Sequence, residues 1–195
     1  MKLIHKLFDN KVRAYNLLFE IELKEYLDIS NKILKKNSFQ RRRVKSSSTV
    51  YSLLKEDLKT GCIIPPIVLA LSKNSKEIFA KNLIEDNDDN NVEDLIEKYQ
   101  EHLIILDGLQ RTYTIRDIFN SIKSSSDKDM VEKLSQNTIR IEIYVGIDKL
   151  GILYRMLTLN TGQTPMSLRH QIEILYSDYL EEDLNGIKLL LEAED

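Results

Sequence analysis

The segment His102–Ile115, HLIILDGLQRTYTI, constrains the fold more than any other part of the chain. The apolar run Leu103–Leu106 is too short for a buried helix and contains β-branched residues, which favours a strand. Asp107-Gly108 is a strong turn dipeptide, and the polar segment after it is compatible with a helix. The sequence therefore predicts a strand, a tight turn and a helix that starts near Gln110.

This predicted turn is also the best candidate site in the sequence. The start of a helix leaves backbone N–H groups without intrahelical partners and carries the positive end of the helix dipole. The guanidinium group of Arg111 would lie beside these groups. Such an arrangement favours an anion, for example a phosphate group.

Composition limits the class of protein. A chain of 195 residues with 42% hydrophobic residues fits one domain, with or without a helical extension. The net charge of −3 argues against a protein that coats nucleic acid by charge alone, although Lys35–Lys45 is a local basic focus. The single cysteine, Cys62, excludes an internal disulfide and a cysteine-based zinc site, and we interpret it as a buried apolar residue.

The first residues do not have the pattern of a signal peptide. Charges at Lys2, Lys6, Asp9 and Lys11 interrupt any apolar core, and no apolar run approaches membrane-spanning length. We therefore expect a cytoplasmic protein without a membrane partner.

Three further segments are predicted to be strands: Leu17–Leu23, Ile67–Leu69 and Thr138–Val145. The last alternates apolar and polar residues throughout and is the clearest strand pattern in the chain. Pro65 and Pro66 force an extended entry to the second, which is apolar enough for a buried strand beside the one that ends at Leu106.

Helical patterns fill much of the remaining chain. They are a helix through Tyr51, Leu54 and Leu58 that stops at Gly61, a helix near Glu93–Glu101, a helix over Thr112–Ile122, a short helix after the polar break Ser124–Asp129, a helix from Asp148 through Leu157, and a helix opened by Pro165. The run Glu85–Asp94 is predicted to be a solvated loop, and it lacks the glycine and glutamate register of a calcium loop.

The order of these motifs resembles the ParB/sulfiredoxin-like superfamily. Closest are the DGQQR-type domain of GmrSD-like restriction systems and the DGQHR domain of DNA-modification-linked proteins. Three separate matches carry the resemblance, over roughly residues 39–170. They are Phe39-Gln40-Arg41 for an early YQR element, Asp107-Gly108-Leu109-Gln110-Arg111 for the DGQQR or DGQHR pattern, and Asn160–Ser167 for an N-x-x-G-x-x-L-S segment. Leu109 departs from the pattern, which has glutamine there.

The resemblance implies an α/β (α+β) fold with a mixed sheet, flanking helices and a helical C-terminal extension. In this interpretation residues 1–38 are a strand/helix lead-in, residues 39–147 are the ParB/sulfiredoxin-like core, and residues 148–195 are a helical extension that completes the pocket. We expect a single domain. GmrSD-like proteins commonly carry a further nuclease domain, so the chain could be one part of a longer protein.

The resemblance implies a nucleotide-binding module, with NTP hydrolysis or nucleolytic action on DNA as its enzyme activity, in phage defence or restriction of modified DNA. The alternative is a non-catalytic DNA-binding or regulatory module linked to DNA modification. Expected partners are nucleotide and DNA. The charged, leucine-bearing segment Asp178–Asp195 could contact a protein partner or a second copy.

The resemblance and the residue chemistry together suggest site residues. The candidate catalytic residues are Asp107, Gln110, Arg111 and His170, with Asp107 also a candidate ligand for Mg²⁺ beside a nucleoside triphosphate. The candidate phosphate-binding residues are Gln40, Arg41, Gly108, Thr112, Asn160, Gly162, Gln163 and Arg169. Ordinary structural roles remain open for several of them, such as turn chemistry for Asp107 and a helix C-cap for Gly162.

Overall fold

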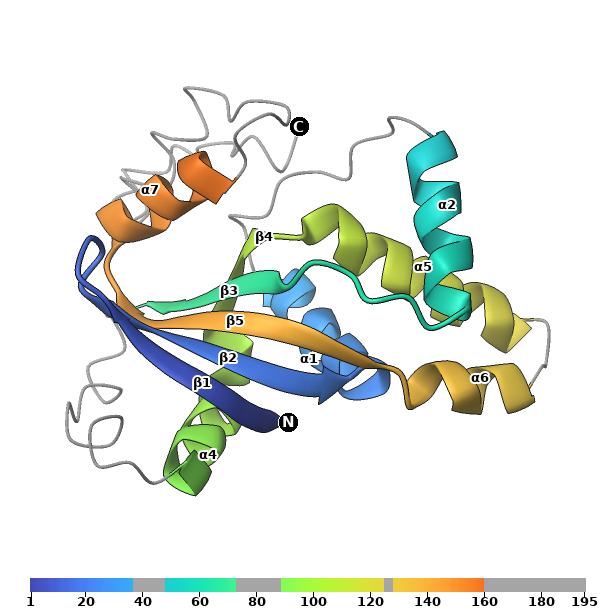
Figure 1. The fold of residues 1–195 in the computed structure, drawn as a ribbon, viewed down its shortest axis with the longest axis horizontal. Coiled ribbons are helices and arrows are strands. Elements are labelled where there is room, and N and C mark those ends of the chain that lie inside the picture. The colour runs from blue at the N-terminus through green and yellow to red at the C-terminus, as the bar shows by residue number, and fades with distance from the viewer. Residues whose placement is uncertain (37–47, 73–88, 125–127, 160–195) are drawn as a thin grey trace, which may run out of the picture.

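The computed structural model describes residues 1–36, 48–72, 89–124 and 128–159 (Figure 1). The strands are β1 Lys2–Asp9, β2 Ala14–Glu22, β3 Ile67–Ser72, β4 Leu103–Asp107 and β5 Thr138–Ile147. The helices are α1 Leu23–Lys36, α2 Ser48–Lys59, α4 Asp89–Tyr99, the 3-10 turn η1 Gln100–His102, α5 Leu109–Ser124, α6 Lys128–Ser135 and α7 Lys149–Leu159. The predicted α+β class is confirmed.

The described strands form one mixed sheet in the order β1-β2-β5-β3-β4. β3 and β5 run parallel, whereas the β1/β2, β2/β5 and β3/β4 pairs are antiparallel. The predicted adjacency of the Pro-Pro strand and the strand ending in Asp107 is confirmed, because Val68 pairs with Asp107. The end of β4 therefore lies beside the beginning of β3.

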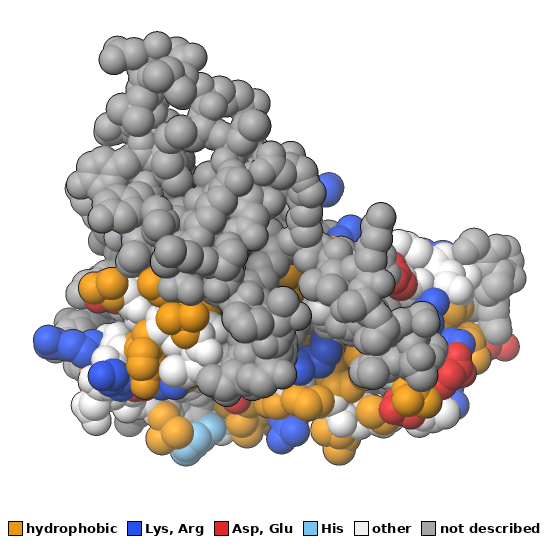
Figure 2. Space-filling model, turned by 90° about the horizontal axis from the view of Figure 1, so that it is seen from above, with side chains coloured by type: hydrophobic (Ala, Val, Ile, Leu, Met, Phe, Trp, Pro, Cys, Tyr) orange, Lys and Arg blue, Asp and Glu red, His pale blue; other side chains and the backbone are white. Residues whose placement is uncertain are grey.

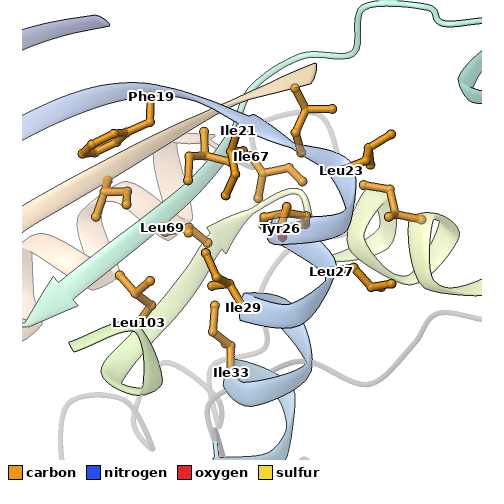
Figure 3. Close-up of a cluster of buried hydrophobic side chains, with 14 of the residues drawn as sticks. Phe19, Ile21, Leu23, Tyr26, Leu27, Ile29, Ile33, Ile67, Leu69 and Leu103 are labelled. Carbon is orange, nitrogen blue, oxygen red and sulfur yellow. The ribbon is translucent and has the colours of Figure 1, made fainter. Parts of the chain in front are cut away.

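The larger core lies on one face of the sheet. Alternate residues of β5, including Ile139, Ile141 and Ile143, are buried there with Phe19 of β2. Figure 3 shows Tyr26 and Ile33 of α1 projecting into the same cluster as side chains of β2 and β3. Helix α5, whose first turn follows β4 directly, packs against α1, α2 and α6.

The second face of the sheet is partly covered by α7. Ile152 and Met156 of this helix are buried against Ala70 of β3 and Tyr144 of β5. Elsewhere on this face charged side chains stand opposite one another, as Glu20 and Arg140 do in neighbouring strands. The first half of β5 therefore alternates between buried and more exposed residues, whereas Ile143–Ile147 is buried on both faces.

Most predicted strands and helices agree with the structure to within a few residues. The prediction of a solvated loop over Glu85–Asp94 is wrong for its last part, because α4 begins at Asp89. Buried Val92, Leu95 and Ile96 hold this helix in the core, while Asp94 and Glu97 are exposed on its other side. Burying one apolar face of three residues is enough here to make a mainly polar segment helical.

Cys62 is less buried than the sequence suggested, and several predicted segments cannot be compared with the structure. Cys62 is half-buried at the margin of the larger core. The helix opened by Pro165, the C-terminal extension beyond Leu159 and the Phe39-Gln40-Arg41 element lie outside the described residues. None of the described helices has the length and apolar character needed to cross a membrane.

Candidate functional site

The turn between β4 and α5 is built around Arg111. This residue lies in the first turn of α5, and its Nη2 donates hydrogen bonds to Asp107 Oδ2 at 2.6 Å and to the Pro66 carbonyl oxygen at 3.1 Å. The side chains of Asp107 and Arg111 are 16% and 19% exposed, so the ion pair is largely withdrawn from water. The arginine thus links the end of β4 to the entry of β3.

Gly108 makes this arrangement possible. Its φ is +92°, a conformation that residues with a Cβ rarely adopt. A Cβ at this position would lie 3.0 Å from Arg111 Nη2 and 3.1 Å from Ile67 Cγ1. Because Gly108 has no side chain, the backbone can turn sharply there and the guanidinium group of Arg111 can pass close to it.

Thr112 supports the turn from inside the protein. Its hydroxyl donates to the Gly108 carbonyl oxygen at 3.0 Å and lies 2.7 Å from the Tyr26 hydroxyl of α1. Thr112 and Tyr26 are both completely buried. The Thr112 side chain, predicted to bind phosphate, thus faces the core and supports the backbone of the turn.

The electrostatics of the turn combine a helix start with a restrained cation. The first intrahelical bond runs from Thr112 N to Gly108 O at 2.9 Å, which makes Gly108 the N-cap of α5. The N–H groups of Leu109, Gln110 and Arg111 therefore precede the first intrahelical donor, Thr112, and have no acceptor within the helix. Arg111 Nε is buried and has no hydrogen-bond partner among the described residues. Gln110 is half-buried and lies two residues after the N-cap.

The predicted site residues divide into two groups. The structure brings together Asp107, Gly108, Gln110, Arg111 and Thr112 at one end of the sheet. The others lie outside the described residues: Gln40, Arg41, Asn160, Gly162, Gln163, Arg169 and His170. Sequence reasoning missed Tyr26 and the Pro66 carbonyl. Pro66 lies next to the predicted strand entry, but nothing in the local pattern around Tyr26 signals its contact with α5.

Asp107 was predicted to bind Mg²⁺, and the side chains around it can be compared with the ligands that Mg²⁺ needs. Mg²⁺ is commonly held by one or two carboxylates together with substrate phosphates. Asp107 Oδ2 is already bonded to Arg111. No group of three or more His, Cys, Asp or Glu side chains gathers within the described ranges. The described part of the turn therefore does not supply a metal cage of its own.

A second polar cluster joins α7 to the β1–β2 hairpin. Arg155 of α7 forms an ion pair with Asp9, and its guanidinium carbon lies 5.1 Å and 5.7 Å from the ring centroids of Tyr144 and Tyr154. Lys11 Nζ lies 5.3 Å from the Tyr154 ring. In Figure 2, apolar side chains stand beside Lys and Arg side chains at the end of the molecule where α7 and the hairpin lie in Figure 1.

Asp9 has an altered pKa because of this cluster. Burial alone raises the pKa of the Asp9 carboxyl, but hydrogen bonds from Arg155 and from the N–H groups of Lys11 and Val12 outweigh that effect. The pKa of Asp9 therefore lies below its usual value.

We predict that Asp9 contributes to the acid sensitivity of the protein. A carboxyl whose pKa is lowered by folding stabilises the folded state above its unfolded pKa, and this contribution is lost as pH falls through the lowered pKa. Asp9→Asn should therefore lower the free energy of unfolding at pH 7 and flatten its decline below about pH 4. Urea unfolding at a series of pH values measures both effects, with Asp28→Asn, an exposed position on α1, as the control. Parallel pH profiles for wild type and Asp9→Asn would contradict the prediction.

Comparison with models of protein families, with curated proteins and with solved structures finds no match to this chain. The resemblance to the ParB/sulfiredoxin-like superfamily therefore continues to depend on the motifs themselves.

Proposed function

We propose that this chain is a nucleotide-binding domain of ParB/sulfiredoxin-like type that engages phosphate groups at the β4–α5 turn and acts on DNA in phage defence or modification-dependent restriction. The observation that carries the proposal is the restrained position of Arg111 at the N-terminus of α5, with both of its observed bonds on Nη2. Neither bond uses Nη1, which would donate a charge-assisted hydrogen bond to a phosphate oxygen.

Fixing the guanidinium group in advance supports this function. Asp107 and the Pro66 carbonyl orient the side chain before any ligand arrives, so less side-chain entropy is lost on binding. The positive end of α5 adds to the attraction for an anion. Strand β3, which follows Pro65-Pro66, the β4–turn–α5 unit and the later strand β5 also occur in the order expected from the resemblance.

A DNA-binding module without catalysis is the second candidate, and the Asp107–Arg111 ion pair favours it over hydrolysis. Asp107 Oδ2 is occupied by its 2.6 Å bond to Arg111, so this oxygen is not placed to take a proton from a substrate. The described histidines, His5 and His102, are exposed on β1 and η1, away from this turn. Within the described residues, an acid and a base do not converge at the turn, so binding is the activity that we test first.

The first test is calorimetric titration of ATP, GTP and CTP, each with and without Mg²⁺, into the wild-type protein. We expect at least one nucleotide to bind and its affinity to fall about tenfold or more in the double variant Asp107→Asn, Arg111→Gln, because a charge-assisted phosphate contact contributes about 1.5–3 kcal/mol. The double substitution avoids leaving a partly buried aspartate without its partner.

Arg116→Gln is the matched control, because Arg116 lies on the same helix one turn beyond the site and carries the same charge. The nucleotide affinity of Arg116→Gln should equal that of the wild type. Absence of binding by every nucleotide, or undiminished binding by the double variant, would refute the proposed nucleotide site. Steeply salt-dependent DNA binding in the absence of nucleotide binding would instead support the second candidate.

A further inference from the structure

Tyr26 is a completely buried phenol in the centre of the larger core. It lies on α1, among side chains of α1, β2 and β3, as Figure 3 shows. Burial raises the pKa of Tyr26 far above its ordinary value, so the hydroxyl stays protonated. A buried hydroxyl is costly without a hydrogen-bond partner, and Thr112 Oγ1 at 2.7 Å provides one.

The direction of this hydrogen bond follows from counting hydrogens. The Thr112 hydroxyl has one hydrogen, and it donates that hydrogen to the Gly108 carbonyl oxygen at 3.0 Å. Thr112 Oγ1 can therefore only accept at its contact with Tyr26, so the Tyr26 hydroxyl donates. The result is a directed chain from Tyr26 through Thr112 to the carbonyl of Gly108.

This chain ends on the first peptide group of α5. The Gly108 carbonyl oxygen accepts both the Thr112 hydroxyl and the Thr112 N–H, the latter at 2.9 Å. The same peptide group carries the Leu109 N–H at its other end. Hydrogen bonds in series polarise one another, so bonds to the carbonyl oxygen make the N–H of that peptide a stronger donor. The chain also fixes the orientation of the peptide group.

We propose that Tyr26 is a positioning residue for the phosphate site: through Thr112 it orients and polarises the Gly108–Leu109 peptide group, and so raises the affinity of the α5 N-terminus for a diphosphate or triphosphate group. This inference depends on the proposed function. Tyr26 belongs to α1, 86 residues before Thr112 in the chain. The N-terminal lead-in therefore forms part of the support of the site.

The test uses inorganic pyrophosphate as the probe and Tyr26→Phe as the variant. Phenylalanine keeps the ring packing and leaves the Thr112–Gly108 bond in place, so only the first bond of the chain is lost. We expect the affinity for pyrophosphate to fall about fivefold, the effect of about 1 kcal/mol. The amide resonance of Leu109 should shift in the free protein.

Ser30→Ala is the matched control. Ser30 is a second completely buried hydroxyl on α1, and it donates to the Leu27 carbonyl oxygen at 2.9 Å within the same helix. The control should lose similar stability but keep the wild-type affinity and the wild-type Leu109 resonance. Thr112→Val interrupts the chain at its second member and should weaken pyrophosphate binding at least as much as Tyr26→Phe.

The outcomes separate the two proposals. Weaker binding by Tyr26→Phe, with an unchanged control, supports the role of Tyr26. The role of Tyr26 is overturned if Tyr26→Phe binds pyrophosphate as tightly as the wild type does. It is also overturned if Tyr26→Phe and Ser30→Ala lose the same amount of pyrophosphate affinity. Both results leave the proposed function intact. Absence of pyrophosphate and nucleotide binding by the wild type overturns the proposed function and the positioning role together.

Discussion

Replacing Gly108 by alanine should lower the free energy of unfolding by about 3 kcal/mol. Left-handed backbone costs a residue with a Cβ about 1–2 kcal/mol, and inserting an atom into a packed site costs about 1–3 kcal/mol more. The new Cβ would meet Arg111 Nη2 at 3.0 Å and Ile67 at 3.1 Å, so the guanidinium group or the start of β3 would have to move. In a chain of 195 residues, a loss of this size lowers the melting temperature by about 10 °C.

Gly61→Ala provides the matched comparison. Gly61 also has a positive φ, +85°, but a Cβ there would meet no atom within 4 Å. It should therefore show only the backbone cost, about 1–2 kcal/mol. The difference between the two variants, measured by urea unfolding, isolates the contact of Gly108 with Arg111 and Ile67. Equal losses would mean that Arg111 does not pass over Gly108 in solution.

The strands near the site could be predicted because local pattern and burial agree. β5 alternates between a buried side, such as Ile141 and Ile143, and a partly solvated side, such as Glu142. β3 is buried along nearly all of its length because α5 lies on one face and α7 on the other, and its apolar run reflects that. In both strands the pattern of apolar residues matches the faces of the strand that are buried.

β1 and α1 were not predicted from the sequence. β1 has an irregular register between Leu3 and His5, and the extra residue, Ile4, breaks the two-residue period on which recognition depends. β1 is also an edge strand with exposed Leu7 and Phe8, so its apolar residues do not mark a buried face. Helix α1 follows β2 without an intervening loop, since β2 ends at Glu22 and α1 begins at Leu23, and this hides the boundary.

The candidate site shows the same limit. The spacing of Asp107 and Arg111 across a strand–turn–helix unit is local, and the sequence alone suggested that they lie together. The contacts that fix them come from distant segments: the Pro66 carbonyl is 45 residues before Arg111, and Tyr26 is 86 residues before Thr112. Contacts of this kind depend on the order of strands in the sheet, which local periodicity does not encode.

The ion pair between α7 and the β1–β2 hairpin supplies the second large effect. Arg155→Met keeps an apolar chain against the Tyr144 ring but leaves the Asp9 carboxylate partly buried without its cation. Because removing one member of a buried pair is much more costly than losing a surface contact, we expect the free energy of unfolding to fall by about 2–3 kcal/mol. The matched control is Lys59→Met, which removes the exposed Glu56–Lys59 pair and should cost less than about 0.5 kcal/mol.

A double-variant cycle tests the cause of this loss. Asp9→Asn removes the negative charge, and the asparagine oxygen can still accept the Lys11 N–H that Asp9 Oδ1 accepts at 2.9 Å. The variant that combines Asp9→Asn with Arg155→Met should therefore be more stable than Arg155→Met alone, because no unpaired charge remains. Urea unfolding of the four proteins at pH 7 gives the coupling energy directly. Additive losses would show that Arg155 stabilises the molecule through its contacts with Tyr144 and Tyr154 instead of through Asp9, since only the charge pair connects the two substituted positions.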